Sequence, residues 1–276
     1  MPMPDRNPTE EIVAKILAMP KYKNVQMPVE TIRALIANCG PGSRGPADLE
    51  KRVREKLHNI VAPYLGDLDY TDATEAFARI KGDPGAVREF SARALTAHAS
   101  TRERGPELER LYQSLFEEMG MAGKICGVAD LACGLHPLGL PFMNLPSGCA
   151  YYAYDLHMAR VHFLDTFIRE QGYAGGCFHR DILLSPPAEK FGVAFFFKEA
   201  HRFEKREPGA LLRLIDRLDA SRIVVSLPIQ SLGTRSQISP KYESMLREYA
   251  KANSLLLKSM VFGNEIFYVI FTENTP

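Results

Sequence analysis

The spacing of short apolar runs in the second half of the chain constrains the fold more than any other feature. From residue 124 onward, runs rich in β-branched and aromatic residues alternate with helix-compatible segments, at intervals of about 25 residues. Because parallel strands need a crossover of roughly a dozen residues or more, we expect the first five runs to form parallel strands. These runs cover residues 125–131, 150–154, 176–179, 193–197 and 222–227.

The last two runs have a different connection. Residues 255–262 and 265–271 are separated only by Gly263 and Asn264, which predicts an antiparallel hairpin. Five parallel strands followed by a hairpin are typical of class I methyltransferases rather than of dinucleotide dehydrogenases. We therefore predict an α/β protein with a class I, Rossmann-like methyltransferase domain.

The first hundred residues show no pattern that indicates a strand. Prolines, glycines and aspartates separate five helical segments, at residues 10–18, 28–38, 47–61, 71–81 and 84–97. Within this region, the Gly- and Pro-rich stretch 39–46 predicts a loop that divides the helices into two small bundles. We expect an all-helical N-terminal domain over residues 1–104 and the catalytic domain over residues 105–276.

Composition excludes several classes of protein. A net charge of +1 predicts no strong global field, and five cysteines without CxxC spacing favour buried free thiols over disulfides or a zinc site. His157 and His162 are too far apart to share one helical face, so no metal is expected. The chain has no apolar run of about eighteen residues and no signal-peptide layout at its start, so we expect a cytoplasmic protein without a membrane span.

The first predicted strand leads into a turn that contains Asp130, Ala132, Gly134 and Pro137. A dinucleotide site normally has three glycines there, because the backbone must approach a pyrophosphate, and this turn has one. S-adenosylmethionine contains no pyrophosphate, so the pattern favours that methyl donor. The alternative is a turn with a purely structural role.

Carboxylates follow the next two strands. Asp155 ends the second strand, where it can accept both ribose hydroxyls of an adenosine or simply cap the next helix. Asp181 and Ile182 follow the third strand, where they can contact the adenine amino group and ring, or belong to an unrelated loop. We expect three neighbours of these positions, Ala132, Leu156 and Phe197, to line the same donor site.

Lys198 follows the fourth strand, at the edge where a substrate would face the methyl group. A cation there suits an anionic or hydrogen-bond-accepting substrate. The sequence has no Gly-x-Ser-x-Gly elbow and no Cys–His arrangement between a strand and a helix, so it gives no support to nucleophilic hydrolysis. It shows no convincing general base either.

Together these stretches resemble the aminoglycoside-resistance 16S rRNA methyltransferases that modify N7 of guanosine 1405, the Arm/Rmt group and its actinomycete relatives. The resemblance covers nearly the whole chain, and segment 226–235 is its most specific part. The stretches that carry it are residues 12–17, 21–23, 51–58, 100–104, 130–137, 154–157, 197–198, 224–235 and 264–270.

The resemblance implies a helical N-terminal domain that docks on 16S rRNA in the assembled 30S subunit, and a second domain that binds S-adenosylmethionine and releases S-adenosylhomocysteine. By motif position, Arg104 resembles the partner of the donor carboxylate, whereas Gly134, Asp155 and Asp181 resemble the cradle for the donor backbone, ribose and adenine. The residues that resemble positions tied to target binding or methylation are Lys198, Glu204, Arg235 and Glu265.

Two positions depart from the family pattern: His136 stands where Asn is usual, and Ile229-Gln230 stand where Thr-Arg is usual. The second departure removes a cation near the expected RNA face. Two other hypotheses therefore stay open, a small-molecule methyltransferase with a helical lid and a non-catalytic module that binds the donor or RNA. A basic surface on the N-terminal domain, continuous with the donor pocket, would favour the rRNA enzyme.

Overall fold

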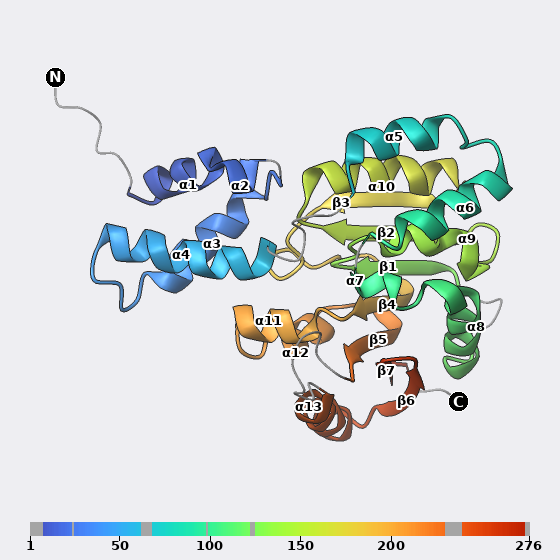
Figure 1. The fold of residues 1–276 in the computed structure, drawn as a ribbon. Helices are drawn as coiled ribbons and strands as arrows, with labels where there is room; N and C mark the ends of the chain where they lie inside the picture. The colour runs from blue at the N-terminus through green and yellow to red at the C-terminus, as the bar shows by residue number, and fades with distance from the viewer. Residues whose placement is uncertain are drawn as a thin grey trace.

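A computed structural model describes residues 8–23, 25–61, 68–97, 99–121, 125–229 and 239–273 (Figure 1). Its centre is a seven-stranded sheet with the order β3-β2-β1-β4-β5-β7-β6. Strands β1 to β5 are parallel, and β7 pairs antiparallel with both β5 and β6. The strands are β1 (Gly127–Leu131), β2 (Ala150–Asp155), β3 (Ala174–His179), β4 (Phe191–Phe197), β5 (Ala220–Pro228), β6 (Leu256–Phe262) and β7 (Glu265–Phe271). The predicted α/β class, the parallel strands and the final hairpin are confirmed.

Helices surround this sheet and make up the described N-terminal region. That region contains α1 (Pro8–Ala18), α2 (Pro20–Lys23), α3 (Val29–Cys39), α4 (Pro46–Val61), α5 (Tyr70–Ala78), α6 (Pro84–Ala94) and α7 (Ala99–Arg102). A short 3-10 turn (Gly105–Glu107) then leads into α8 (Leu108–Glu118). The later helices are α9 (Leu140–Met143), preceded by a 3-10 turn (His136–Gly139), α10 (Met158–Glu170), α11 (Ala200–Arg206), α12 (Ala210–Asp216) and α13 (Ser239–Ala252). The helical prediction for the N-terminal region is therefore confirmed where the chain is described.

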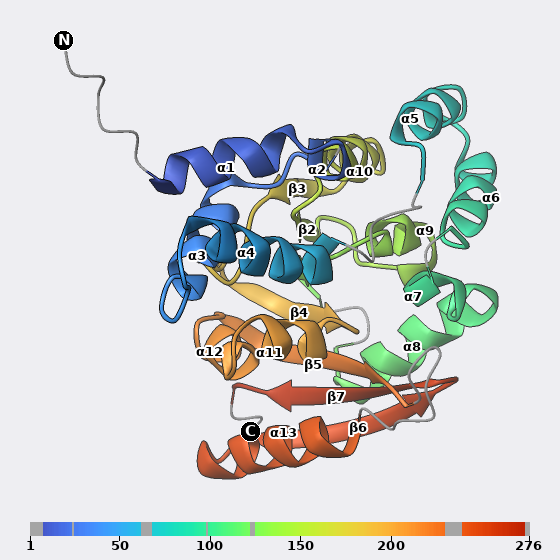
Figure 2. The same cartoon turned by 60° about the vertical axis from the view of Figure 1, so that its left-hand side comes forward.

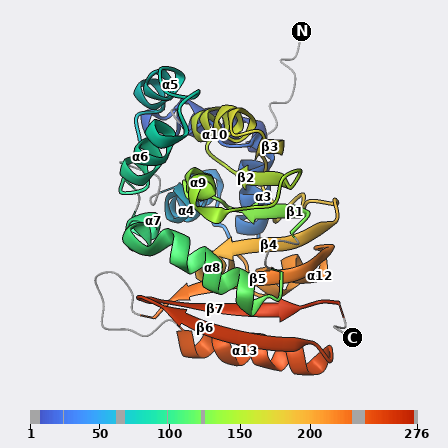
Figure 3. The same ribbon diagram turned by 90° about the vertical axis from the view of Figure 1, so that its right-hand side faces the viewer.

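The sheet is covered on both faces, because neighbouring residues of each strand point to opposite sides. Val128 and Phe195 belong to one core, with α5, α6, α8, α9 and α10. Ala129 and Phe196 belong to the other, with α11, α12 and α13. Figure 3 shows α6, α8 and α9 along the first of these faces. Burial on both faces explains why these strands appear in the sequence as almost continuous apolar runs.

The helices before residue 62 have a core of their own. Ile36 and Cys39 of α3 pack with Val53 and Leu57 of α4 in that core. The prediction that stretch 39–46 divides two bundles was therefore wrong. A short Gly- and Pro-rich turn lets consecutive helices fold back on each other, and α3 and α4 do so here.

The next helices, α5 and α6, belong to the main core instead. Phe77 of α5 and Phe90 of α6 pack against Phe163 of α10, with ring centroids 6.3 Å apart in both cases. Figures 1 and 3 show α5 beside α10. The separation between cores thus falls between α4 and α5, whereas the domain boundary at residue 104 stays a prediction.

No helix in the described ranges is long and apolar enough to cross a membrane. Four of the cysteines are buried free thiols, as predicted, whereas Cys126 is exposed.

Candidate donor-binding site

A cavity of about 250 Å³ lies at the carboxyl edge of the parallel strands. Open α/β sheets bind their ligands at this edge, where loops from neighbouring strands meet. Five of the predicted donor residues line the cavity, and they follow three different strands: Ala132, Asp155, Leu156, Asp181 and Ile182. Tyr154 and Arg180 also line the cavity. The remaining wall comes from α4, through Lys56, Asn59 and Ile60, and from the region of α11. Figure 2 shows α4 beside α11, over the end of the sheet.

The turn after β1 has an unusual backbone. Ala132 and Gly134 both adopt positive φ angles, of 52° and 55°. A positive φ is strained for alanine, and such strain is concentrated at ligand-binding sites. The amide of Cys133 donates to the carbonyl of Tyr154 at 3.0 Å, and the amide of Gly134 donates to Oδ2 of Asp155 at 3.0 Å. The turn is therefore fastened to the end of β2.

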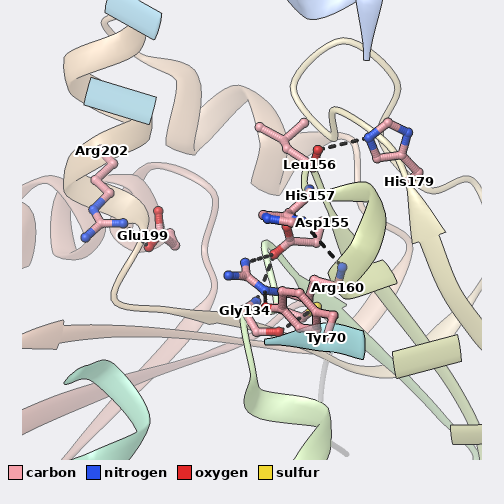
Figure 4. Close-up of polar contacts among 10 residues, drawn as sticks. Tyr70, Gly134, Asp155, Leu156, His157, Arg160, His179, Glu199 and Arg202 are labelled. Atoms are coloured by element: carbon pink, nitrogen blue, oxygen red, sulfur yellow. Dashed lines mark hydrogen bonds and ion pairs between the residues drawn. The ribbon is translucent and has the colours of Figure 1, made fainter. Parts of the chain in front are cut away.

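Asp155 is almost fully buried and is held from three sides (Figure 4). Besides Gly134, the amide of His157 donates to its Oδ1 at 2.9 Å, and Nη1 of Arg160 donates to its Oδ2 at 3.0 Å. Asp155 borders the cavity, so its predicted contact with the ribose stays a prediction, whereas the N-cap of α10 is His157 and not Asp155.

Asp181 has more partners than the sequence suggested. Its Oδ1 accepts from the amide of Leu183 at 3.1 Å and from Nη1 of Arg206 at 3.0 Å. Its Oδ2 accepts from Nη2 of Arg206 and from Oγ1 of Thr31, the latter at 2.8 Å. A carboxylate offers about four acceptor positions, so all are occupied. The predicted contact with an adenine amino group would have to replace one of these bonds.

Glu199 and Arg202 form the wall opposite Asp155 in Figure 4, and their side chains pair at 2.9 Å. Burial raises the pKa of Glu199 to about 7, although Arg202 acts against this shift. Burial also lowers the pKa of His201 to about 4, and the cations Arg202 and Lys205 lower it further. His201 is therefore neutral at pH 7, and Glu199 keeps its proton to a higher pH than an exposed glutamate does.

A second group of charges includes three predicted residues. Nε of Arg104 donates to Glu265 at 2.8 Å, and Nζ of Lys198 lies 2.7 Å from Glu103 and 3.4 Å from Glu265. Burial acts to raise the pKa of Glu265, but Arg104 and Lys198 outweigh it and hold that pKa below its usual value. Arg104, Lys198 and Glu265 are buried, and Lys198 has a positive φ of 60° at the end of β4.

Arg104 also lies over the ring of Phe197, 4.7 Å from the ring centroid. Its Nε and Nη2 both bond to Glu265, which within the described part of the chain leaves Nη1 for another acceptor. Arg104, Phe197, Lys198 and Glu265 therefore form one cluster, which does not line the 250 Å³ cavity. The structure supports a role for Glu265 in orienting two cations.

The remaining predicted residues lie elsewhere. The carboxylate of Glu204 accepts from the backbone amides of Gly209 and Leu211, both at 2.9 Å, so its role in the structure is to cap the start of α12. It does not reach the cavity. Arg235 and Gln230 lie outside the described residues.

His136, one of the two departures from the family pattern, is accommodated by a buried network. Its Nδ1 lies 2.9 Å from Asp130 Oδ2, which also accepts from the hydroxyl of Tyr151 at 2.7 Å. Among the described residues, no cluster of three His, Cys, Asp or Glu side chains is arranged to hold a metal ion.

Sequence reasoning missed the cations that hold the two aspartates. Arg160 lies on the buried side of α10 with Leu164 and Phe167, at helical spacing, and a charge among apolar residues is a signal that could have revealed it. Arg206 and Thr31 gave no such signal. Thr31 lies 150 residues before its partner Asp181 and is not distinguished by its neighbours in the sequence.

A basic groove runs along α2 and α4. It is lined by Met19, Pro20, Tyr22, Lys51, Arg54, Glu55 and His58. Lys51 and Arg54 are exposed, and neither has an ion pair within the described ranges. Lys56, Asn59 and Ile60 of the same helix line the donor cavity, so α4 contributes residues to both the groove and the cavity.

Comparisons with known proteins agree with this geometry. The family described as "Ribosomal RNA methyltransferase (FmrO)" matches residues 19–269 of the chain. A 16S rRNA (guanine(1405)-N(7))-methyltransferase of Micromonospora echinospora is 31% identical over 246 residues, which covers 87% of this chain and 89% of the relative. One of the same name from Serratia marcescens is 28% identical over 263 residues, which covers 94% and 97%.

Solved structures give the same result. The 16S rRNA methylase RmtB superposes with a TM-score of 0.76 and 25% identity, over 96% of this chain and 98% of that one. The 16S rRNA methyltransferase RmtF, crystallised with S-adenosylhomocysteine, superposes with a TM-score of 0.75 and 26% identity, over 98% and 99%.

Proposed function

Since the chain belongs to the ribosomal RNA methyltransferase (FmrO) family, we propose that it transfers a methyl group from S-adenosylmethionine to N7 of guanosine 1405 in 16S rRNA. The observation that carries this proposal is that α4 lines both the cavity at the carboxyl edge of the sheet and an exposed groove that contains Lys51 and Arg54. A small-molecule methyltransferase needs the cavity but not the groove.

The residues around the cavity fit an adenosine. Ile182 offers an apolar surface for a base, and Oδ1 of Asp155 accepts one hydrogen bond and so retains a position for a hydroxyl. In the neighbouring cluster, Nη1 of Arg104 suits the carboxylate of the donor. When bound, S-adenosylmethionine supplies an electrophilic methyl group on a sulfonium. We assign its adenosine to the cavity and its amino-acid part to the side of Gly134 and Arg104.

The chain needs no general base for this reaction. Guanine N7 carries a lone pair in the ring plane, so no proton has to leave before the methyl group is transferred. Catalysis then depends on bringing N7 into line with the methyl–sulfur bond, which is an effect of orientation. In a structured rRNA helix the base has to leave its stack first, at a cost of a few kcal/mol. We place Lys198, fixed by Glu103 and Glu265, at the edge where that base enters.

We further propose that the target is the assembled 30S subunit in the cytoplasm, and that the helical region before residue 105 docks on it. Lys51 and Arg54 are then phosphate contacts, which fix the enzyme on rRNA without reading its sequence.

The test is methylation of purified 30S subunits with labelled S-adenosylmethionine, followed by borohydride and aniline, which cleave RNA at N7-methylguanosine. We expect one cleavage site in 16S rRNA. Expressed in a susceptible bacterium, the protein should protect against gentamicin and kanamycin but not apramycin, because the methyl group adds bulk and positive charge to a single guanine edge. Donor binding without cleavage or resistance would contradict the rRNA target and favour a small-molecule substrate or a non-catalytic module.

A further inference from the structure

The hydrogen bonds of Asp155 limit what this residue can offer a ligand. Each carboxylate oxygen has about two acceptor positions. Those of Oδ2 are taken by the amide of Gly134 and by Nη1 of Arg160, both at 3.0 Å. Oδ1 accepts only from the amide of His157, at 2.9 Å. Within the described chain, Asp155 therefore retains a single acceptor position, on Oδ1, although it borders the cavity.

Arg160 is the residue that closes the Oδ2 side. Its side chain is fully buried, at 0% exposure, so its charge needs a partner, and Asp155 is one such partner. Its Nε donates to the hydroxyl oxygen of Tyr70 at 2.8 Å. Because the guanidinium group is a rigid plane, bonds at Nε and Nη1 together fix its orientation.

Tyr70 is distant from Arg160 in the sequence. It is the first residue of α5, 90 residues before Arg160, and its ring lies against His157 at 5.3 Å and Phe163 at 6.1 Å between centroids. Figure 4 shows Tyr70 and Arg160 grouped with Asp155 and Gly134. Tyr70 of α5 thus holds Arg160, and Arg160 in turn holds Asp155 at the donor cavity.

We infer that Arg160 and Tyr70 position Asp155 so that it accepts one ribose hydroxyl of the donor, through Oδ1, and not both. This inference rests on the proposed use of S-adenosylmethionine. Arg160 and Tyr70 are positioning residues, since they act on the ligand only through Asp155. If Arg160 and Tyr70 only neutralised a buried carboxylate, their substitution would not change how Asp155 discriminates between the two ribose hydroxyls.

The two roles are separated by calorimetry with S-adenosylhomocysteine and its 2′-deoxy and 3′-deoxy analogues. With the wild-type chain, we expect removal of one hydroxyl to weaken binding by roughly 10-fold or more, and removal of the other by less than about threefold. Arg160→Met should weaken binding of S-adenosylhomocysteine and abolish the difference between the two analogues. Arg160→Lys, which keeps a cation near Oδ2, should restore much of the difference between the two analogues.

Tyr70→Phe provides a milder variant that keeps the ring contacts and removes the hydroxyl that accepts from Nε of Arg160, so it should reduce the difference between the analogues without unfolding the protein. Arg169→Met is the matched control, because Arg169 lies on the same helix in an exposed pair with Asp165. We expect it to leave both affinities unchanged.

The inference would be overturned if removal of either hydroxyl weakened binding to the wild-type chain equally. It would also be overturned if the difference between the two analogues were unchanged in both Tyr70→Phe and Arg160→Met. Failure of the wild-type chain to bind S-adenosylhomocysteine at all would contradict the proposed donor instead, so the two failures are distinguishable.

Discussion

At the residue scale, the two aspartates of the cavity differ in what surrounds them. Asp155 keeps an acceptor position, whereas Asp181 uses its full capacity on Arg206, Thr31 and Leu183. Thr31 belongs to α3, in the core formed by the helices before residue 62, and Arg206 to α11. Asp181 therefore connects the N-terminal helices to the catalytic sheet, a role that a loop carboxylate does not reveal in the sequence.

Thr31→Val tests whether adenine competes for Asp181. The change keeps the shape of the side chain and removes one buried hydrogen bond to a charged group, worth roughly 1.5–3 kcal/mol. We expect a melting temperature lower by several °C and, because Oδ2 gains a free position for the adenine amino group, tighter binding of S-adenosylhomocysteine. Thr166→Val, at an exposed position of α10, is the control for both measurements. Lower stability with unchanged affinity would show that adenine does not use Asp181.

Glu199 makes stability depend on pH. Its pKa of about 7 lies above the value near 4.5 expected for an exposed glutamate, chiefly because the side chain is buried. Between these values the native state holds a proton that the unfolded chain has lost, so Glu199 makes stability fall as pH rises through this window. Glu199→Gln removes the ionisable carboxyl group and therefore this loss of stability. We expect it to be more stable than wild type by about 1–3 kcal/mol at pH 8, and similar at pH 5, in urea unfolding.

The control for this measurement is Glu89→Gln, an exposed carboxylate on α6 that pairs weakly with Arg93 at 3.8 Å. It should change little at either pH. The contrary outcome is a difference in free energy of unfolding between Glu199→Gln and wild type that is the same at pH 8 and pH 5. In that case the carboxyl group of Glu199 ionises in the native state as an exposed one does.

At the element scale, α4 contributes residues to both the donor cavity and the groove that we propose for docking. The double variant Lys51→Ala with Arg54→Ala removes two exposed cations from the groove and leaves Lys56 at the cavity. We expect S-adenosylhomocysteine to bind as before, 30S methylation to fall at limiting subunit concentration, and the salt dependence of 30S binding to weaken by about one unit of log–log slope per cation.

The matched control removes two cations from elsewhere in the same region, Arg79 at the C-terminal end of α5 and Arg93 of α6. Both are exposed and pair with glutamates one turn away, so their loss should change neither donor binding nor the salt slope. An equal loss of 30S methylation in the control would indicate that overall charge, rather than the groove of α4, governs docking.

The elements could be predicted well because their signals are local. Buried parallel strands such as β4 appear as continuous apolar runs, and two residues between β6 and β7 allow only a hairpin. Contacts between distant elements leave no such trace. The bond from Thr31 to Asp181 joins elements 150 residues apart and depends on how they approach each other, which spacing in a single sequence does not encode. The loop at 39–46 was misinterpreted for the same reason, since a turn looks alike whether its helices separate or pack together.

At the scale of the whole molecule, the catalytic sheet depends on helices outside the predicted domain of residues 105–276. Phe77 and Phe90 cover Phe163 and Phe167 of α10, and removing α5 and α6 would expose these rings to water. Burying an aromatic side chain contributes roughly 1.5–3 kcal/mol, whereas a whole domain is stable by only about 5–15 kcal/mol. The same cut separates Glu265 from Arg104, and Lys198 from Glu103.

We therefore expect a fragment of residues 105–276 to lack cooperative unfolding, and a fragment of residues 68–276 to fold, because this second cut falls where the two cores separate. The longer fragment still lacks Thr31 and the cavity wall formed by Lys56, Asn59 and Ile60, so it should bind S-adenosylhomocysteine more weakly than the full chain and should not methylate 30S subunits. Thermal melts by circular dichroism, calorimetry and the cleavage assay measure these three properties in parallel. Full methylation by residues 68–276 would show that the first four helices are not needed for docking, and a cooperative melt of residues 105–276 would show that α5 and α6 are dispensable for the sheet.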